Sequence, residues 1–165
     1  LGKIIGGGFP VGAVAGRDAA MQVFEGGGGL PHGGTFNGNP VTMLAGMATM
    51  EGMTRQAFDE LNALGDFARE GFREAFGSAG VTGQVTGQGS LMRLHLTDRP
   101  LTNYRTVYPT TEESARMNVV HRHLLNAGYY QATYGLICLS TVNTREEVEG
   151  LIAATVEGIQ VAAAL

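Results

Sequence analysis

Glycine is concentrated at the start of this chain, and this restricts the folds that the segment can adopt. Thirteen of the 26 glycines fall within the first 40 of 165 residues. Each glycine inside a helix costs about 1 kcal/mol relative to alanine, so a long helix is excluded here. Short strands and tight loops are predicted instead, and the run EGGGGLPHGG, residues 25–34, is predicted to be a mobile connector.

From residue 40 onward, apolar side chains recur at helical spacing. Asn39 is a predicted N-cap, and Pro40 suits the first position of the helix that follows. Four apolar residues lie at helical spacing in this segment, and we expect them to fill a core rather than to bind a metal. They are Met43, Leu44, Met47 and Met50.

Three further helices are predicted along the remainder of the chain. Residues 55–76 carry an apolar face at helical spacing. A capping box formed by Thr110 and Glu113 begins the next helix, and a second capping box, Thr144 with Glu147, begins the last.

Strands are predicted between these helices. The order from about residue 57 is therefore helix, strands, helix, strands, helix, which is typical of an α+β unit. The predicted strands are residues 81–89, 90–98, 129–133 and 135–141, and residues 99–109 are expected to be a loop.

Several polar residues have ordinary structural interpretations. His95 is expected on a solvated strand face, and Cys138, in the apolar run LICLS, is expected to be a buried thiol. His121 and His123 are two residues apart and point to different helix faces, so no metal site is predicted. The single cysteine favours a reducing compartment, and we expect a cytoplasmic protein.

The charge and hydropathy of the chain exclude two kinds of partner. The formal net charge is −4, and the arginines are scattered, so no nucleic-acid partner is expected. No apolar stretch is long enough to cross a bilayer, so no membrane partner is expected. Hydrophobic residues make up 44%, as in ordinary globular proteins.

Lys3 is the only lysine in the chain, whereas the other ten basic residues are arginines. Arginine stays protonated in proteins, but a desolvated lysine amine becomes neutral and attacks carbonyl groups. Lys3 is therefore a candidate nucleophile, and the alternative is a solvated surface lysine.

The nucleotide-binding and catalytic motifs that glycine-rich sequences suggest are absent. Lys3 precedes its glycines, so there is no P-loop, and Val11 interrupts a G-x-G-x-x-G pattern counted from Gly6. The sequence also lacks H-E-x-x-H, C-x-x-C and G-x-S-x-G.

Two motifs remain, LGKIIGGGFPVGAVAGR and GGTFNGNP. Together they resemble the class III pyridoxal-phosphate aminotransferases, most closely the glutamate-1-semialdehyde aminomutase-like branch. The resemblance implies an α/β fold-type I enzyme, in which residues 1–56 end the large cofactor-binding domain and residues 57–165 form the C-terminal α+β small domain. It implies that Lys3 forms the Schiff base with pyridoxal 5'-phosphate. It further implies that Gly34 and Thr35 bind the cofactor's phosphate across a homodimer interface.

The activity implied by the resemblance is transfer of an amino group from an amino acid or amine to a keto or aldehyde acceptor, by a ping-pong mechanism. Two alternatives stay open. One is the aminomutase reaction, and the other is a non-catalytic phosphate-binding or structural domain.

The sequence departs from the family pattern in two places. Aminomutases of this branch carry an acidic residue shortly after the position of Tyr130, but QATYGLICLS has none. Aminotransferases for β-amino acids place an arginine near the position of Tyr134. We also expect this chain, which begins with Leu1, to be the C-terminal piece of a longer protein whose N-terminal half supplies other cofactor contacts. Arg17 is either a charge that faces the ligand or a surface residue that begins a helix.

Overall fold

The structure is a computed structural model that describes residues 1–24 and 29–164, and at Lys3 it describes the backbone only. Residues 25–28 of the predicted connector therefore lie outside the described residues. The chain forms two compact units, Leu1–Ala57 and Phe58–Leu165, which are described separately here. Their assignment to a large and a small domain stays a prediction.

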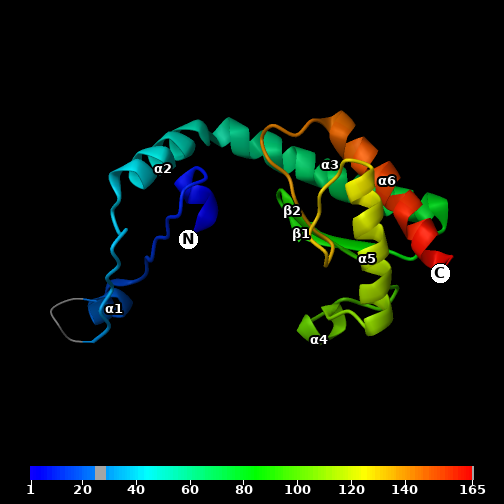
Figure 1. Cartoon of the computed structure of the whole chain (residues 1–165), viewed down its shortest axis with the longest axis horizontal. Coiled ribbons are helices and arrows are strands. Elements are labelled where there is room, and N and C mark those ends of the chain that lie inside the picture. Colours follow the sequence, from blue (N-terminus) through cyan, green and yellow to red (C-terminus); the bar gives the residue numbers. More distant parts are fainter. Residues whose placement is uncertain (25–28, 165) are drawn as a thin grey trace. The chain divides into compact units, whose positions relative to one another are not determined.

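The first unit is built from short helical turns and one longer helix (Figure 1). The strands predicted for residues 1–40 do not form in its described part, where the extended pairing is a single antiparallel bridge between Gly2 and Gly12. Glycine favours tight turns here because it adopts backbone conformations with positive φ that other residues avoid. The helical elements are η1 (Lys3–Gly6), α1 (Asp18–Met21), η2 (Gln22–Phe24) and α2 (Pro40–Gly52).

Helix α2 begins as the sequence predicts. Oδ1 of Asn39 accepts hydrogen bonds from the backbone N–H groups of Val41, at 3.0 Å, and Thr42, at 3.3 Å. The expected core role of its apolar residues is wrong for this chain, because Met43, Leu44, Met47 and Met50 are each more than half exposed. The buried residues of α2 are instead Thr42 and Gly46. Apolar periodicity indicates which face of a helix can be buried. The surface that would cover this face is decided by tertiary structure.

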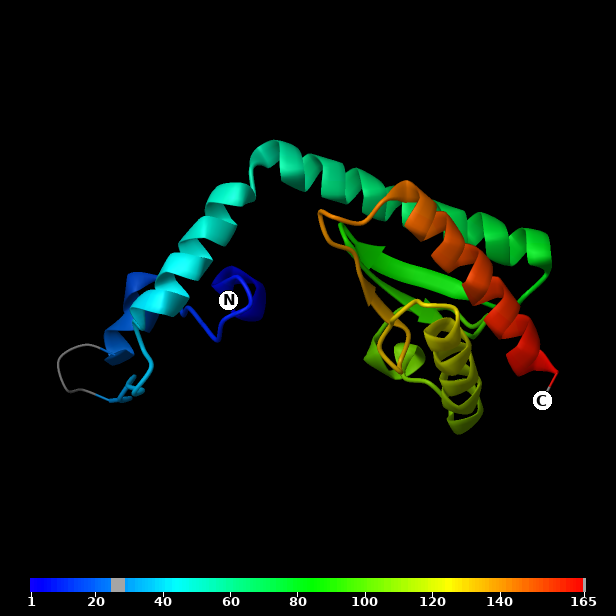
Figure 2. The same ribbon diagram turned by 45° about the horizontal axis from the view of Figure 1, so that its top comes forward.

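The second unit is an α+β fold around an antiparallel sheet with strand order β1-β2-β3. Helices α5 and α6 pack against each other, and they share one apolar core with α3 and the sheet (Figure 2). Phe72 of α3, Met92 of β2 and Val120 of α5 are among its most buried side chains. The elements are α3 (Arg55–Ala79, which begins in the first unit), β1 (Gln84–Gln88), β2 (Leu91–His95), α4 (Tyr104–Val107), α5 (Thr111–Asn126), β3 (Leu136–Cys138) and α6 (Arg145–Ala163).

Both predicted capping boxes are confirmed. The Thr110 side chain accepts from the Glu113 N–H at 3.1 Å, and the Glu113 carboxylate accepts from the Thr110 N–H at 2.8 Å. Thr144 and Glu147 make the same exchange at the start of α6, at 3.2 and 2.9 Å. Within residues 1–24 and 29–164, no helix combines the length and apolar character needed to span a bilayer.

Three sequence expectations about residues 99–109, residues 129–133 and Cys138 are wrong. Residues 99–109 are not all loop, because Asn103 caps the short helix α4. Residues 129–133 form no strand, because the chain turns there: the Gly135 N–H donates to the Ala132 carbonyl at 2.9 Å. Cys138 is exposed rather than buried, because alternation along β3 turns Ile137 inward and leaves its neighbour outside.

Candidate active site

The backbone of Lys3 is held in a closed loop. Lys3 begins η1 directly after Gly2, and Gly7 ends it with φ of 58°, a conformation that glycine adopts without strain. The Ala13 N–H donates to the Leu1 carbonyl at 3.0 Å, which closes the segment around η1. The side chain of Lys3 lies outside the described part of the structure, so its catalytic role stays a prediction.

Helix α2 supports this loop through a close backbone approach, which Figure 2 shows beside the N-terminus. A Cβ atom at Gly46 would lie 2.5 Å from the carbonyl oxygen of Ile5, and one at Gly7 would lie 2.6 Å from that of Ala45. Contacts this short are not tolerated against backbone atoms, so glycine is required on both sides. The two glycines therefore place the start of the Lys3 loop against a rigid helix.

Gly34 and Thr35 lie in a turn immediately before α2. The Asn37 N–H donates to the Gly34 carbonyl at 3.0 Å, and Thr35 occupies the turn with an exposed side chain. Asn39, two residues after Asn37, caps the helix. The Lys3 loop and this turn thus border α2 at different points, and the phosphate contact assigned to Gly34 and Thr35 stays a prediction.

His95 is not on a solvated face, which corrects the sequence expectation. It is 6% exposed, and its Nε2 lies 2.8 Å from Oγ1 of Thr86 on the neighbouring strand. Burial, with a smaller contribution from the Arg93 and Arg99 charges, lowers the pKa of His95 to about 4. The imidazole is therefore neutral at pH 7. The sequence predicted an exposed His95 because a strand pattern does not reveal which elements cover the second face of a sheet.

Arg93 and Tyr134 form a second feature of this region. The Arg93 Nε donates to the Tyr134 carbonyl at 3.1 Å, and the guanidinium carbon lies 5.4 Å from the centroid of the Tyr134 ring. The structure therefore places the Arg93 guanidinium next to the Tyr134 ring. The sequence does not indicate this pairing, because the two residues are 41 positions apart.

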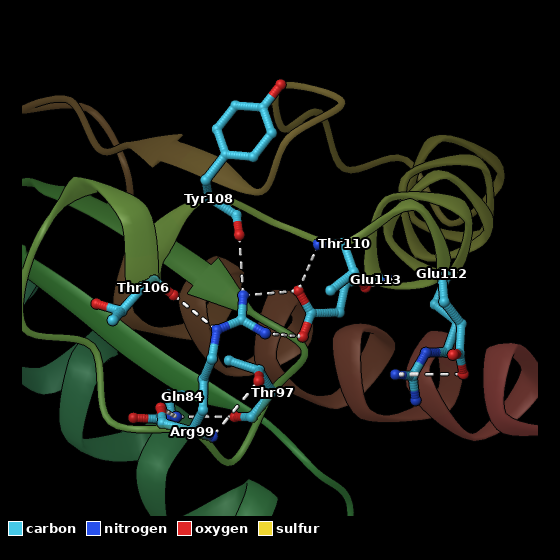
Figure 3. A network of polar contacts seen from close by, with 9 residues as sticks. Gln84, Thr97, Arg99, Thr106, Tyr108, Thr110, Glu112 and Glu113 are labelled. Atoms are coloured by element: carbon cyan, nitrogen blue, oxygen red, sulfur yellow. Dashed lines mark hydrogen bonds and ion pairs between the residues drawn. The ribbon is translucent and has the colours of Figure 1, made fainter.

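No local sequence pattern indicates the role of Arg99, which Figure 3 shows among the groups that it binds. Its guanidinium donates to the carbonyls of Thr106, at 2.7 Å, and Tyr108, at 3.0 Å. It also makes a bidentate pair with the Glu113 carboxylate, at 2.5 and 2.9 Å. We call these four residues the Arg99 clamp. The clamp connects the end of β2 to α4 and to the start of α5.

The clamp changes the titration of Glu113. Hydrogen bonds from Arg99 lower the pKa of the Glu113 carboxyl to about 2, against a smaller opposing effect of burial, with help from the Thr110 N–H. The carboxylate is charged at all physiological pH values. The Arg99 clamp is therefore a structural ion pair with no net charge rather than a group poised for proton transfer.

Comparison with known proteins identifies the family. Residues 1–144 match the protein family described as Aminotransferase class-III. The chain belongs to this family. The matched residues include the Lys3 loop, helix α2 and all three strands of the β1-β2-β3 sheet.

Relatives of this class-III aminotransferase chain include both activities considered above. A glutamate-1-semialdehyde 2,1-aminomutase of Sorangium cellulosum (strain So ce56) is 34% identical over 161 residues, which cover 96% of this chain and 36% of the relative. An omega-transaminase from Sphaerobacter thermophilus matches with a TM-score of 0.90 and 47% identity, over 98% of this chain and 38% of that one. A transaminase with PLP bound matches with a TM-score of 0.81 and 35% identity, over 98% and 37%.

The class-III aminotransferase chain thus spans well under half the length of the relatives it matches. The structural neighbours also establish the fold type, because they are transaminases that match over nearly all of this chain. The predicted α/β fold type I is confirmed.

Proposed function

We propose that this chain carries the lysine-bearing segment and the C-terminal unit of a pyridoxal 5'-phosphate-dependent aminotransferase. The enzyme transfers an amino group from an amino acid or amine to a keto or aldehyde acceptor. The observation that carries this proposal is the family match over residues 1–144, which includes Lys3, together with the fold of the Sphaerobacter transaminase. The rest of the protein, a partner of this chain in the proposal, supplies the remaining cofactor contacts.

The residues present fit the cofactor chemically. A lysine amine condenses with an aldehyde, and an exposed hydroxyl beside turn N–H groups suits a phosphate. Lys3 and the Gly34–Thr35 turn provide these groups, and the Gly7 and Gly46 contacts keep the Lys3 loop close to α2. Pyridoxal phosphate bound there would supply an electron sink for the substrate carbon that bears the nitrogen. The neutral Lys3 amine would remove the proton from that carbon and hold it as an ammonium group.

The experiment is reduction of the full-length protein with borohydride. We expect a yellow protein whose visible absorbance disappears on reduction, with the cofactor mass on the peptide that contains Lys3. Because Lys3 is the only lysine of this chain, the assignment within it is unambiguous. Lys3→Ala should abolish transamination while the far-UV circular dichroism stays unchanged. Transamination retained by folded Lys3→Ala would refute the proposed role.

A second candidate is the aminomutase reaction, which the Sorangium relative favours. The absence of an acidic residue in QATYGLICLS argues against it. Incubation with glutamate-1-semialdehyde and no second carbonyl compound separates the two, because only an aminomutase completes an isomerisation under these conditions. A protein without visible absorbance, cofactor binding or turnover would favour the third alternative, a non-catalytic phosphate-binding or structural domain.

We also propose that the protein is a homodimer in which Thr35 contacts the cofactor phosphate of the neighbouring subunit. Loss of one hydrogen bond to a charged phosphate costs roughly 1.5–3 kcal/mol, so Thr35→Val should weaken cofactor affinity at least tenfold. Mixed dimers of Lys3→Ala and Thr35→Val subunits then contain one intact site, since each site takes one residue from each subunit. At a cofactor concentration too low to load Thr35→Val dimers, about a quarter of wild-type activity should return after random mixing. No recovery would refute the shared site.

The proposed location is the cytoplasm, on the basis of the single cysteine. Fractionation of cells that express the full-length protein tests this. Recovery of the protein outside the cytoplasmic fraction would contradict it.

A further inference from the structure

A pocket opens in the C-terminal unit between β2, the first half of α5 and the turn that carries Tyr134. Its volume is about 210 Å³, and its polar lining includes Arg93, His95, Ser114, Asn118 and Thr133. Pockets for drug-sized ligands usually measure roughly 300–1,000 Å³, so this one suits a smaller molecule. Val107 and Pro109, which are partly exposed, contribute an apolar wall to the lining.

Arg93 is held in this pocket without a carboxylate partner. Its Nε donates to the Tyr134 carbonyl, and its guanidinium lies against the Tyr134 ring. Among the described residues, the arginines that form ion pairs are Arg69, Arg73, Arg99 and Arg116, so both terminal nitrogens of Arg93 keep their N–H groups available. The hydrogen bond to the Tyr134 carbonyl and the contact with its ring restrict the guanidinium before any ligand arrives.

The other charged groups of the pocket compensate each other. Arg99 is paired with Glu113 in the Arg99 clamp, and these two groups have no net charge together. His95 is neutral, as its burial requires. The pocket wall therefore carries the single uncompensated positive charge of Arg93. One negative charge on a ligand balances it.

We propose that this pocket binds the carboxylate of a small organic acid through the two terminal nitrogens of Arg93. A guanidinium presents parallel N–H groups that match the two oxygens of a carboxylate, and such bidentate pairs are stronger than neutral hydrogen bonds. The hydroxyls of Ser114 and Thr133 supply further hydrogen bonds, and the apolar wall accepts the carbon chain. The acid is either the amino or keto acid of the reaction, an assignment that rests on the proposed function, or a separate acid.

Calorimetric titration of the full-length holoenzyme with butyrate, and with uncharged butyramide of the same shape, tests the binding. Butyrate should bind at least tenfold more tightly than butyramide, and Arg93→Met should remove this preference. Arg93→Lys keeps the charge but not the paired N–H groups and should show an intermediate affinity. Arg105→Met is the matched control, because it removes an exposed arginine from α4 with the same change in net charge.

His95 reports on the location of the bound acid. Butyrate next to Arg93 should raise the pKa of His95 from about 4, because it neutralises a charge that holds this pKa down. The shift should be absent in Arg93→Met and present in Lys3→Ala, which separates this binding site from the proposed catalytic function. The proposal is overturned if butyrate leaves His95 unchanged, if Arg93→Met keeps the butyrate preference, or if inorganic phosphate binds more tightly than butyrate.

Kinetics distinguish the two sources of the acid. With 3-aminobutyrate as donor, a rise of at least tenfold in KM for Arg93→Met, without a rise for 2-aminobutane, identifies the reaction's own substrate. Unchanged KM values for both donors, with butyrate binding lost, identify a separate acid. If no transamination occurs at all, the proposed function fails while the titration with butyrate still decides the pocket.

Discussion

Replacing Glu113 by glutamine tests how much the Arg99 clamp stabilises the C-terminal unit. The pKa of the Glu113 carboxyl falls from 4.5 to about 2, which corresponds to about 3 kcal/mol in favour of the folded state at pH 7. The Arg99 side chain is 31% exposed, so solvent screening reduces the expected loss in Glu113→Gln to about 2 kcal/mol.

The pH dependence follows from the direction of the shift. Because the folded pKa lies below the unfolded value of 4.5, the stabilisation is present in full above about pH 4.5 and is lost as the pH falls through 2. Near pH 3, about half of it should remain. The difference between wild type and Glu113→Gln should therefore shrink by about half between pH 7 and pH 3.

Hydrogen exchange of the full-length protein, read on peptides that cover residues 104–126, measures the free energy of opening in this region. Glu147→Gln is the matched control, because Glu147 closes the same kind of capping box but is exposed and has no arginine clamp. The Arg99 clamp does not stabilise this region as stated if Glu113→Gln lowers the opening free energy no more than Glu147→Gln does at its own helix. An effect that is equally large at pH 3 and pH 7 would also refute it.

Three further predictions concern other parts of the chain. Gly46→Ala should lower the free energy of unfolding of the first unit, measured by thermal denaturation, by roughly 1–3 kcal/mol, because the new Cβ meets the Ile5 carbonyl. Gly52→Ala, which has open space around it, should not lower this free energy. The imidazole of His95 should titrate near pH 4 by NMR; the stability contributed by its neutral form is complete above pH 6.5 and is lost as the pH falls toward 4, and titration near 6.5 would contradict its burial. Gln131→Met should keep or raise the free energy of unfolding, measured by thermal denaturation, because Gln131 is 1% exposed and its Oε1 has no hydrogen-bond partner in the described structure. A decrease of more than about 1 kcal/mol in this free energy would contradict the prediction.

Local signals predicted the start of α2 in the first unit and much of the second unit. The caps at Asn39, Thr110 and Thr144 are confirmed because a cap joins groups only two or three residues apart. Met92 and Leu94, which share one face of β2, are both buried. Short strands in the first unit and a strand over residues 129–133 were wrong, because strand formation depends on a pairing partner that local sequence does not supply.

The sequence by itself determined the class-III family, through the Lys3 and Thr35 motifs, and the positions at which the longer helices begin. Tertiary structure alone decided that His95 is buried, that Arg99 meets Glu113 and that Arg93 lies against Tyr134. The last two pairs join positions 14 and 41 residues apart. Caps and periodicity act within a few residues and can be recognised along the chain, whereas burial and charge pairing arise only when distant segments pack together.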